Sequence, residues 1–304
     1  MHEKGIVNRF RGVYSAIFTP FHPDNTINFK VLREMIAFQL NAGLHGCYIG
    51  GSTGEGILLT LDERKALAEN AIEALAGKGK AIVHIGALGT SDAIELAKHA
   101  AQAGADAVSA IPPIFFGKSF EAVCRYYEQI AAATALPCFI YNIPGRTGVN
   151  LAFDQLIQLA AIEGVGGLKF THNDLFLLHN LSRHFGDDFL VINGMDELLA
   201  AGLIMGAHGG IGSTYNFFPE HYARLFAAAC NGDFAEVQKW QIATNSYLRA
   251  IKATEYPGTF KRTMAWLGFD CGNPRAPILN YSDDELKPVK AVFEQVRKMV
   301  QVNG

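Results

Sequence analysis

The chain has 304 residues, of which 49% are hydrophobic and 18% are charged, and its formal net charge is -3 at pH 7. This composition predicts a well-filled core and excludes a disordered or collagen-like chain. The balanced charge without a basic run argues against a nucleic-acid-binding protein, whereas an anionic small molecule needs only one local cation.

Eight short apolar or β-branched runs predict eight buried strands. Near-continuous apolarity, rather than alternation, is typical of parallel strands that are covered on both faces. In chain order the runs are residues 12–18, 46–49, 81–86, 107–111, 138–141, 166–169, 189–193 and 209–212.

A helical pattern follows each of these runs. The clearest one begins at Thr60, where Thr60 and Glu63 form a capping-box motif and the apolar residues then recur at helical spacing as far as about residue 77. The other predicted helices are residues 29–42, 91–103, 119–133, 153–161, 174–184, 196–205 and 219–231.

Eight strand-then-helix units within about 230 residues favour a (β/α)₈ TIM barrel over a doubly wound sheet. No G-x-G-x-x-G fingerprint follows the first strand, which further disfavours a nucleotide-binding sheet. After residue 231 only helices are predicted, at residues 233–253, 259–267 and 283–302. We therefore expect a barrel over residues 1–231 and a C-terminal helical extension over residues 232–304.

The sequence gives no sign of a membrane or secreted protein. No run of about 18 apolar residues occurs, and the first residues lack the apolar stretch of a secretory signal, so a cytoplasmic protein is expected. The cysteines are widely spaced and form no CxxC pair, which favours buried reduced thiols over disulfides or a zinc site. They are Cys47, Cys124, Cys138, Cys230 and Cys271.

Lys169 is the only one of the fourteen lysines that ends an apolar strand. Active sites of TIM barrels lie at the carboxyl ends of the strands, and a lysine pressed among apolar neighbours loses hydration and becomes a nucleophile toward carbonyl groups. Lys169 is therefore a candidate Schiff-base lysine. The alternative is a structural lysine that is paired with a carboxylate.

Two other strand ends carry groups that could move a proton or hold an anion. Tyr141 closes the preceding strand, where its phenol could relay a proton, although a buried ring with a wet hydroxyl is an equal alternative. The segment YIGGSTGEG at residues 48–56 combines glycines with the hydroxyls of Ser52 and Thr53, which suits a carboxylate or phosphate. A plain glycine-rich turn is the competing interpretation.

The last two strands end in the segments NGMDE (193–197) and GGIGSTYN (209–216). These place Asp196, Glu197 and Ser213 at the same rim, where they could hydrogen-bond a polyol, although Asp196 could instead serve only as a helix cap. The ten histidines show no H-E-x-x-H or other ligand spacing, so no metal site is predicted.

Four motifs in this order, GGSTGEG, YNIPGRTG, the LK that ends the sixth strand and GGIGSTYN, resemble the pyruvate-dependent class I aldolases of the N-acetylneuraminate lyase and dihydrodipicolinate synthase family. The similarity extends from about Val13 to Val302. It implies a (β/α)₈ barrel with a C-terminal helical extension, usually assembled as a homotetramer.

The resemblance also implies roles for individual residues. Lys169 matches the Schiff-base lysine, Tyr141 matches the proton-relay phenol, and the carboxylate of the keto acid is held at Ser52 and Thr53. In the lyases the hydroxylated tail of the sugar acid is held at the positions that match Thr171, Gly194, Asp196, Glu197 and Ser213. All five residue types are present here.

Two positions depart from the lyase pattern. Arg146 stands where the lyases usually have a small or apolar residue, and in the synthases this arginine helps to hold a substrate carboxylate. Phe115, or a neighbour in IPPIFFGK, replaces the tyrosine that completes the synthase proton relay from the adjacent subunit, and phenylalanine cannot relay a proton.

The sequence thus predicts a cofactor-free aldolase that cleaves N-acetylneuraminate, or a close 2-keto-3-deoxy sugar acid, to pyruvate and an aldehyde sugar. One alternative is a synthase that condenses pyruvate with aspartate semialdehyde. The other is a non-catalytic keto-acid binder, which the presence of both Lys169 and Tyr141 disfavours.

Overall fold

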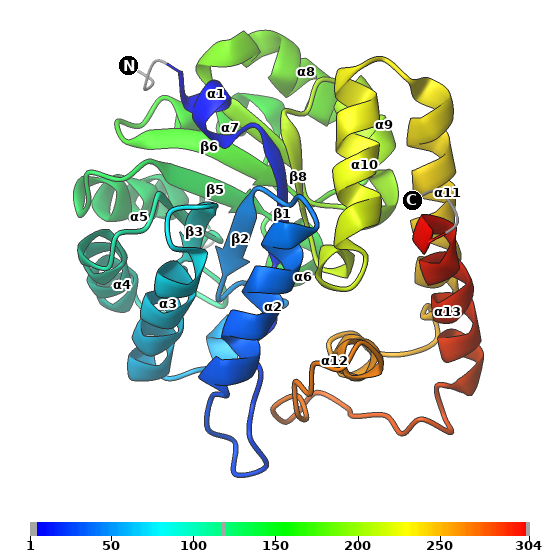
Figure 1. The fold of residues 1–304 in the computed structure, drawn as a ribbon. Coiled ribbons are helices and arrows are strands. Elements are labelled where there is room, and N and C mark those ends of the chain that lie inside the picture. Colours follow the sequence, from blue (N-terminus) through cyan, green and yellow to red (C-terminus); the bar gives the residue numbers. More distant parts are fainter. Residues whose placement is uncertain (1–4, 117–118, 302–304) are drawn as a thin grey trace.

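The computed structural model describes residues 5–116 and 119–301, in which eight parallel strands close into a barrel in chain order (Figure 1). The strands are β1 (Gly12–Ala16), β2 (Gly46–Ile49), β3 (Lys80–His84), β4 (Ala107–Ala110), β5 (Cys138–Asn142), β6 (Val165–Phe170), β7 (Leu190–Asn193) and β8 (Gly209–Gly212). The predicted TIM barrel is confirmed.

Helices between the strands cover the outside of the barrel (Figure 1). They are α2 (Phe29–Asn41), α3 (Leu61–Leu75), α4 (Thr90–Gln102), α5 (Phe120–Ala132), α7 (Phe153–Ala160), α8 (Leu175–Phe185), α9 (Leu199–Ile204) and α10 (Pro219–Cys230). The predicted capping box at the start of α3 is present, since Glu63 N donates to Thr60 Oγ1 and Thr60 N donates to the Glu63 carboxylate.

Two short helices and one irregular segment were not predicted. The helix α1 (Ile6–Phe10) packs its buried side chains against the barrel interior, where the Phe10 ring meets the Phe139 ring edge-on at 5.1 Å. The helix α6 (Pro144–Thr147) follows β5 directly. The predicted helix over residues 196–205 is divided into a 3₁₀ turn (Asp196–Leu198) and the short α9. These elements are too short to show a helical period in the sequence.

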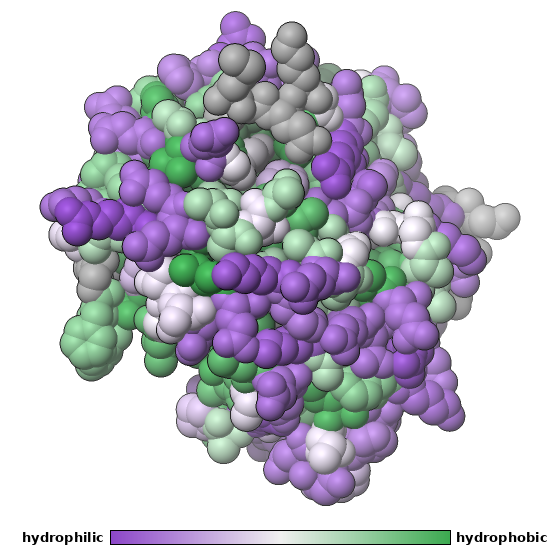
Figure 2. Space-filling model, turned by 90° about the vertical axis from the view of Figure 1, so that its left-hand side faces the viewer, coloured by the Kyte–Doolittle hydropathy of each residue, from purple (hydrophilic) through white to green (hydrophobic). Residues whose placement is uncertain are grey.

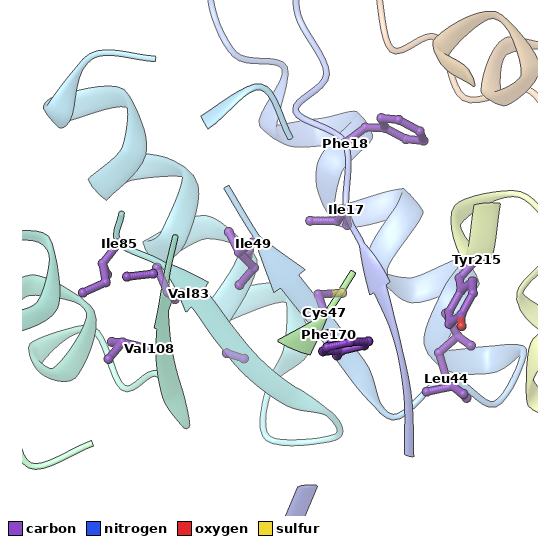
Figure 3. Close-up of a cluster of buried hydrophobic side chains, with 14 of the residues drawn as sticks. Ile17, Phe18, Leu44, Cys47, Ile49, Val83, Ile85, Val108, Phe170 and Tyr215 are labelled. Atoms are coloured by element: carbon purple, nitrogen blue, oxygen red, sulfur yellow. The ribbon is translucent and has the colours of Figure 1, made fainter. Parts of the chain in front are cut away.

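Apolar side chains fill the layer between the strands and the surrounding helices. Figure 3 shows part of this layer, in which Ile49, Val83 and Val108 lie on the neighbouring strands β2, β3 and β4. Each of these side chains is almost fully buried. Because the strands are covered on one face by helices and on the other by the barrel interior, they read as continuous apolar runs.

Three helices follow the barrel, α11 (Phe234–Ala250), α12 (Gly258–Trp266) and α13 (Lys287–Gln301). Figure 1 shows α11 and α13 side by side next to α10. The last predicted helix begins four residues later than expected, and its predicted end at Val302 lies outside the described residues. The division of the chain at residues 231 and 232 stays a prediction.

The surface mixes polar and apolar residues. Figure 2 shows one face on which hydrophilic residues are interspersed with smaller hydrophobic areas. Within residues 5–116 and 119–301, no helix is long and apolar enough to cross a membrane. All five cysteines are free, but the expectation that all are buried is wrong for Cys230, which is exposed at the end of α10, and for the half-buried Cys124.

Candidate active site

Lys169 and Tyr141 lie opposite each other near the carboxyl ends of β6 and β5. The two residues are register partners in the parallel ladder, and both side chains are buried, at 5% and 3% exposure. In a parallel pair, directly opposed residues point to the same face of the sheet. The ladder therefore brings the amine and the phenol together in the barrel interior.

The Lys169 amine lies against aromatic rings rather than against a carboxylate. Its Nζ is 4.0 Å from the centroid of the Tyr141 ring and 4.2 Å from that of Tyr48. Burial lowers the pKa of Lys169 to about 7, and the Asp196 charge opposes this shift only in part. A large fraction of the amine is therefore unprotonated and nucleophilic near neutral pH.

The Tyr141 phenol stays protonated at neutral pH. Burial raises its pKa, while the neighbouring Ser52 hydroxyl and the Arg146 charge partly offset the rise. The phenol can therefore donate a proton, and it can accept one only while it passes its own proton to another acceptor.

The loop after β2 carries Ser52 and Thr53 toward Tyr141. Thr53 is buried, and its Oγ1 lies 2.6 Å from Ser213 Oγ, which follows β8. Residue 56 must be glycine in this turn, because a Cβ on Gly56 would overlap the carbonyl group of Gly50. This tight turn is what places the two hydroxyls at the carboxyl ends of the strands.

Asp196 is held by the loop after β8 and caps no helix. Its Oδ2 accepts hydrogen bonds from Thr214 N at 2.7 Å and from Thr214 Oγ1 at 2.6 Å. Burial raises its pKa to about 6, although the two bonds from Thr214 counteract this. Asp196 thus does not cap the 3₁₀ turn that it begins, and it lines the cavity.

The sugar-tail candidates gather around one wall. Thr171 Oγ1 is buried near the Tyr141 phenol, whose pKa it lowers slightly. It packs so closely on Gly194 that a Cβ at residue 194 would overlap it. Glu197 is exposed at the mouth.

These groups surround a cavity of about 390 Å³. Of the residues predicted from the sequence, it is lined by Lys169, Tyr141, Thr53, Thr171, Gly194, Asp196, Glu197, Ser213 and Arg146. Ser52 lines an adjoining cavity of about 250 Å³ instead, and Ile143 and Arg146 line both. A larger groove of about 850 Å³ lies between α5 and α7, far from these residues, and contains no comparable set of reactive groups.

Phe115 lies outside this cavity. Its side chain is 78% exposed, it stacks edge-on against Phe116, and its φ of 69° is uncommon for a non-glycine residue. In the single chain, this residue therefore contributes no wall to the candidate site.

The C-terminal helices supply part of the cavity that sequence reasoning missed. Tyr256, Phe260, Leu248, Ile251, Lys252 and Thr254 all line it. The Arg146 guanidinium lies 4.8 Å from the centroid of the Tyr256 ring, and burial raises the pKa of Tyr256 to about 12. The sequence indicates these residues only as parts of two helices and of the connection between them, so no local pattern indicated that they close the barrel mouth.

A second feature that sequence reasoning missed is an ion pair that anchors the loop after β2 to the C-terminal extension. Glu55 forms a buried ion pair with Lys261 of α12, with Glu55 Oε1 and Lys261 Nζ 2.6 Å apart. Glu55 Oε2 also accepts a hydrogen bond from Arg275 N at 2.7 Å. The C-terminal extension is therefore bonded to the same loop that carries Ser52 and Thr53.

The sequence profile of the dihydrodipicolinate synthetase family matches residues 9–296. The chain belongs to this family. A curated relative named N-acetylneuraminate lyase, from Rhizobium meliloti (strain 1021), is 35% identical over 289 residues, which cover 95% of this chain and 96% of that protein. The family resemblance and the predicted enzyme class, a carbon–carbon lyase of the aldolase type, are confirmed.

Solved structures of family members share the fold. A protein from Clostridium difficile in complex with mannosamine superposes with a TM-score of 0.90 at 31% identity, covering 94% of this chain and 99% of that chain. A sialic acid aldolase from Ruminococcus gnavus, solved as a mutant of its catalytic lysine, gives 0.92 at 27% identity and covers 99% of both chains. A dihydrodipicolinate synthase from Bacillus anthracis gives 0.89 at 26%, covering 94% and 98%.

Proposed function

We propose that the chain cleaves N-acetylneuraminate, or a closely related 2-keto-3-deoxy sugar acid, to pyruvate and an aldehyde sugar through a Schiff base on Lys169. The observation that carries this proposal is a buried amine that forms no ion pair among the described residues, directly opposite a protonated phenol in a polar-walled cavity. The name of the relatives supplies the substrate class.

The covalent steps follow from these two groups. Lys169 Nζ attacks the C2 ketone, water leaves, and the resulting iminium withdraws electrons from the C3–C4 bond. As that bond breaks, the C4 hydroxyl gives its proton to Tyr141 while the phenol passes its own proton to the substrate carboxylate, directly or through Thr53, which releases the aldehyde sugar and leaves a pyruvate enamine. A proton returns to C3, and water then hydrolyses the iminium to pyruvate and the free lysine.

Substrate binding is assigned to the remaining polar groups. Ser52 and Thr53 hold the carboxylate of the keto acid, since their loop presents two hydroxyls at the site and the Ser52 hydroxyl neighbours Tyr141. Thr171, Asp196, Glu197 and Ser213 hold the hydroxylated tail, with Gly194 leaving room for Thr171.

Arg146 favours one competing function. Its guanidinium borders both cavities, where it could hold the second carboxylate of an aldehyde such as aspartate semialdehyde. A synthase would consume pyruvate in the presence of that aldehyde and ignore sugar acids. A homotetrameric assembly and a location in the cytosol belong to the same proposal.

Borohydride trapping tests the central step. Pyruvate plus borohydride should inactivate the enzyme and leave a reduced adduct on Lys169, identified by peptide mass spectrometry, whereas chelators should have no effect. Because the pKa of Lys169 is about 7, trapping should accelerate as the pH rises toward 7 and level off above it. An adduct on another lysine would refute the assignment.

Assays with a panel of candidate substrates test the proposed substrate class. Pyruvate release from N-acetylneuraminate and shorter 2-keto-3-deoxy acids is measured beside pyruvate consumption with aspartate semialdehyde. Efficient condensation without cleavage would replace the lyase by the synthase. Binding of pyruvate with neither reaction, and no adduct, would indicate the non-catalytic binder.

A further inference from the structure

Tyr48 has no part in the mechanism derived above, yet it contacts the reacting nitrogen. It lies on β2, is fully buried and does not line the substrate cavity. Its hydroxyl donates to Ser109 Oγ at 3.0 Å, and Ser109 Oγ donates to the Phe139 carbonyl oxygen at 3.0 Å. The Tyr48 hydroxyl is thus hydrogen-bonded to the neighbouring strand β4, while the face of its ring lies against Lys169.

The Lys169 nitrogen lies over two rings that pack edge to face. The Tyr48 and Tyr141 centroids are 5.7 Å apart with an interplanar angle of 79°, and Lys169 Nζ is about equally far from both. His84 packs behind them, 6.1 Å from Tyr48 and 5.9 Å from Tyr141. Burial holds the pKa of His84 well below its usual value, so its ring adds no positive charge.

The groups that face Lys169 are therefore few. They are Tyr48 from β2, His84 from β3, Tyr141 from β5 and the Asp196 carboxylate after β7. Among the described residues, Lys169 forms no ion pair like the one that Glu55 gives to Lys261. The Tyr48 and Tyr141 ring faces lie within about 4 Å of its nitrogen.

The reaction needs a stable positive charge at this nitrogen. The iminium withdraws electrons only while it is cationic, and a buried cation without a counter-ion is unfavourable. An aromatic face attracts a cation through its quadrupole, and this attraction is stronger where water is excluded. Unlike a carboxylate, a ring can take no proton from the amine and form no bond with it.

We propose that Tyr48 is a catalytic residue whose ring face stabilises the positive charge of the Lys169 iminium. This inference rests on the proposed Schiff-base function and deepens it. Tyr141 has a similar ring contact but also moves a proton, so only at residue 48 can the effect of the ring be separated from proton transfer.

Graded fluorination of the ring tests this without changing its shape. Tyr48→Phe keeps the ring without the hydroxyl and is the reference for the series. Phenylalanine analogues with one, two and three fluorines at residue 48 weaken the ring quadrupole stepwise. We expect kcat to fall steadily, by about tenfold over the series. The pH midpoint of borohydride trapping should move to lower pH, because the protonated amine loses the same attraction.

Phe139 provides a matched control. It is also a buried ring inside the barrel, but it packs against Phe10, whereas the described ring contacts of the Lys169 amine are with Tyr48 and Tyr141. The same fluorinated residues at position 139 should change neither kcat nor the pH midpoint in a graded way. Equal slopes at both positions would overturn the role of Tyr48, because they would indicate a general effect on packing.

The two proposals fail differently. If pyruvate and borohydride give no Lys169 adduct in the wild type, the Schiff-base function itself is wrong. If the adduct forms but kcat and the pH midpoint do not depend on the number of fluorines at residue 48, only the role of Tyr48 is refuted. A Tyr48→Leu variant that retains the activity of Tyr48→Phe would refute it as well.

Discussion

Within residues 5–116 and 119–301, two lysines are buried, and they differ in whether a carboxylate pairs with the amine. Lys169 is 5% exposed and Lys261 is 1% exposed, burial lowers the pKa of both, and each nitrogen lies about 4 Å from an aromatic ring. Lys261 also pairs with Glu55, whereas Lys169 faces Asp196 only at longer range. The counter-ion therefore separates a structural lysine from one that is free to react.

The Lys261 pair stabilises a junction. It joins α12 to a loop in which Glu55 itself adopts a left-handed φ of 56°. Such a conformation is unfavourable for a side chain of this kind and persists where surrounding contacts hold it. The Glu55 carboxylate, which pairs with Lys261, thus also holds the loop that carries Ser52 and Thr53.

The largest expected effect is the loss of activity on replacing Lys169. Lys169→Met should lower kcat by at least about 10⁴-fold and abolish borohydride trapping, because the nucleophile is gone. Lys261→Met should still form the adduct on Lys169, as mass spectrometry of the trapped protein will show. Trapping lost in the Lys261 variant while the protein stays folded would contradict the division of roles.

Removing the Tyr141 hydroxyl separates the ring from the proton. Tyr141→Phe keeps a ring beside Lys169, so the adduct should still form, but turnover should fall by about 10²–10⁴-fold, the usual range for a positioned proton-transfer group. Single-turnover trapping and steady-state kcat measure the two steps. Wild-type turnover would mean that the phenol is structural.

Replacing Lys261 should cost stability. Lys261→Met leaves Glu55 buried and unpaired, which we expect to lower the free energy of unfolding by about 3–5 kcal/mol in urea titrations. The double variant Glu55→Gln with Lys261→Met removes both charges and should recover most of this loss, since the amide can still accept the bond from Arg275 N. A double variant no more stable than Lys261→Met would show that the pair acts through something other than charge.

Replacing Lys169 should raise the free energy of unfolding rather than lower it. The pKa of Lys169 is about 7 in the folded chain, against 10.5 for an ordinary lysine, so between these values the unfolded chain binds more protons. The wild type therefore gains stability as the pH rises from 7 to 10.5. Lys169→Met should be more stable than the wild type by a few kcal/mol below pH 7, because each tenfold change in proton affinity corresponds to about 1.4 kcal/mol.

The pH dependence decides this prediction. The excess in the free energy of unfolding of Lys169→Met over the wild type should shrink as the pH rises. It should be smallest above pH 10.5, where Lys169 is neutral in both the folded and the unfolded chain. Urea unfolding of the two proteins at matched pH values gives the difference directly, because other titrating groups cancel. A difference that does not vary with pH would show that packing, and not charge, sets it.

Local patterns in the sequence were sufficient for the barrel and for part of its site. Buried parallel strands are apolar throughout, so their ends, and with them Lys169 and Tyr141, can be recognised from a few neighbouring residues. The elements that were missed are short: α1 and α6 contain too few turns to show a period.

The remainder of the site depends on contacts between distant parts of the chain. Glu55 pairs with Lys261 and accepts a bond from Arg275, more than 200 residues away, and Tyr256 reaches the cavity from a connection after the barrel. Nothing in the residues around Lys261 distinguishes it from a surface lysine of a helix. Such pairs follow from how the extension docks, which no local period encodes.

The smallest expected effect concerns Asp196, the acidic group that faces Lys169 without pairing with it. Asp196→Asn removes a charge that favours protonation of Lys169, so the pH midpoint of trapping should move slightly lower. If the carboxylate also holds the sugar tail, kcat/KM for N-acetylneuraminate should fall by the equivalent of about 1–3 kcal/mol, while pyruvate binding barely changes. Measuring both substrates separates the roles: an equal loss for pyruvate and the sugar acid would mean that Asp196 acts only through Lys169, and the tail would have to bind elsewhere.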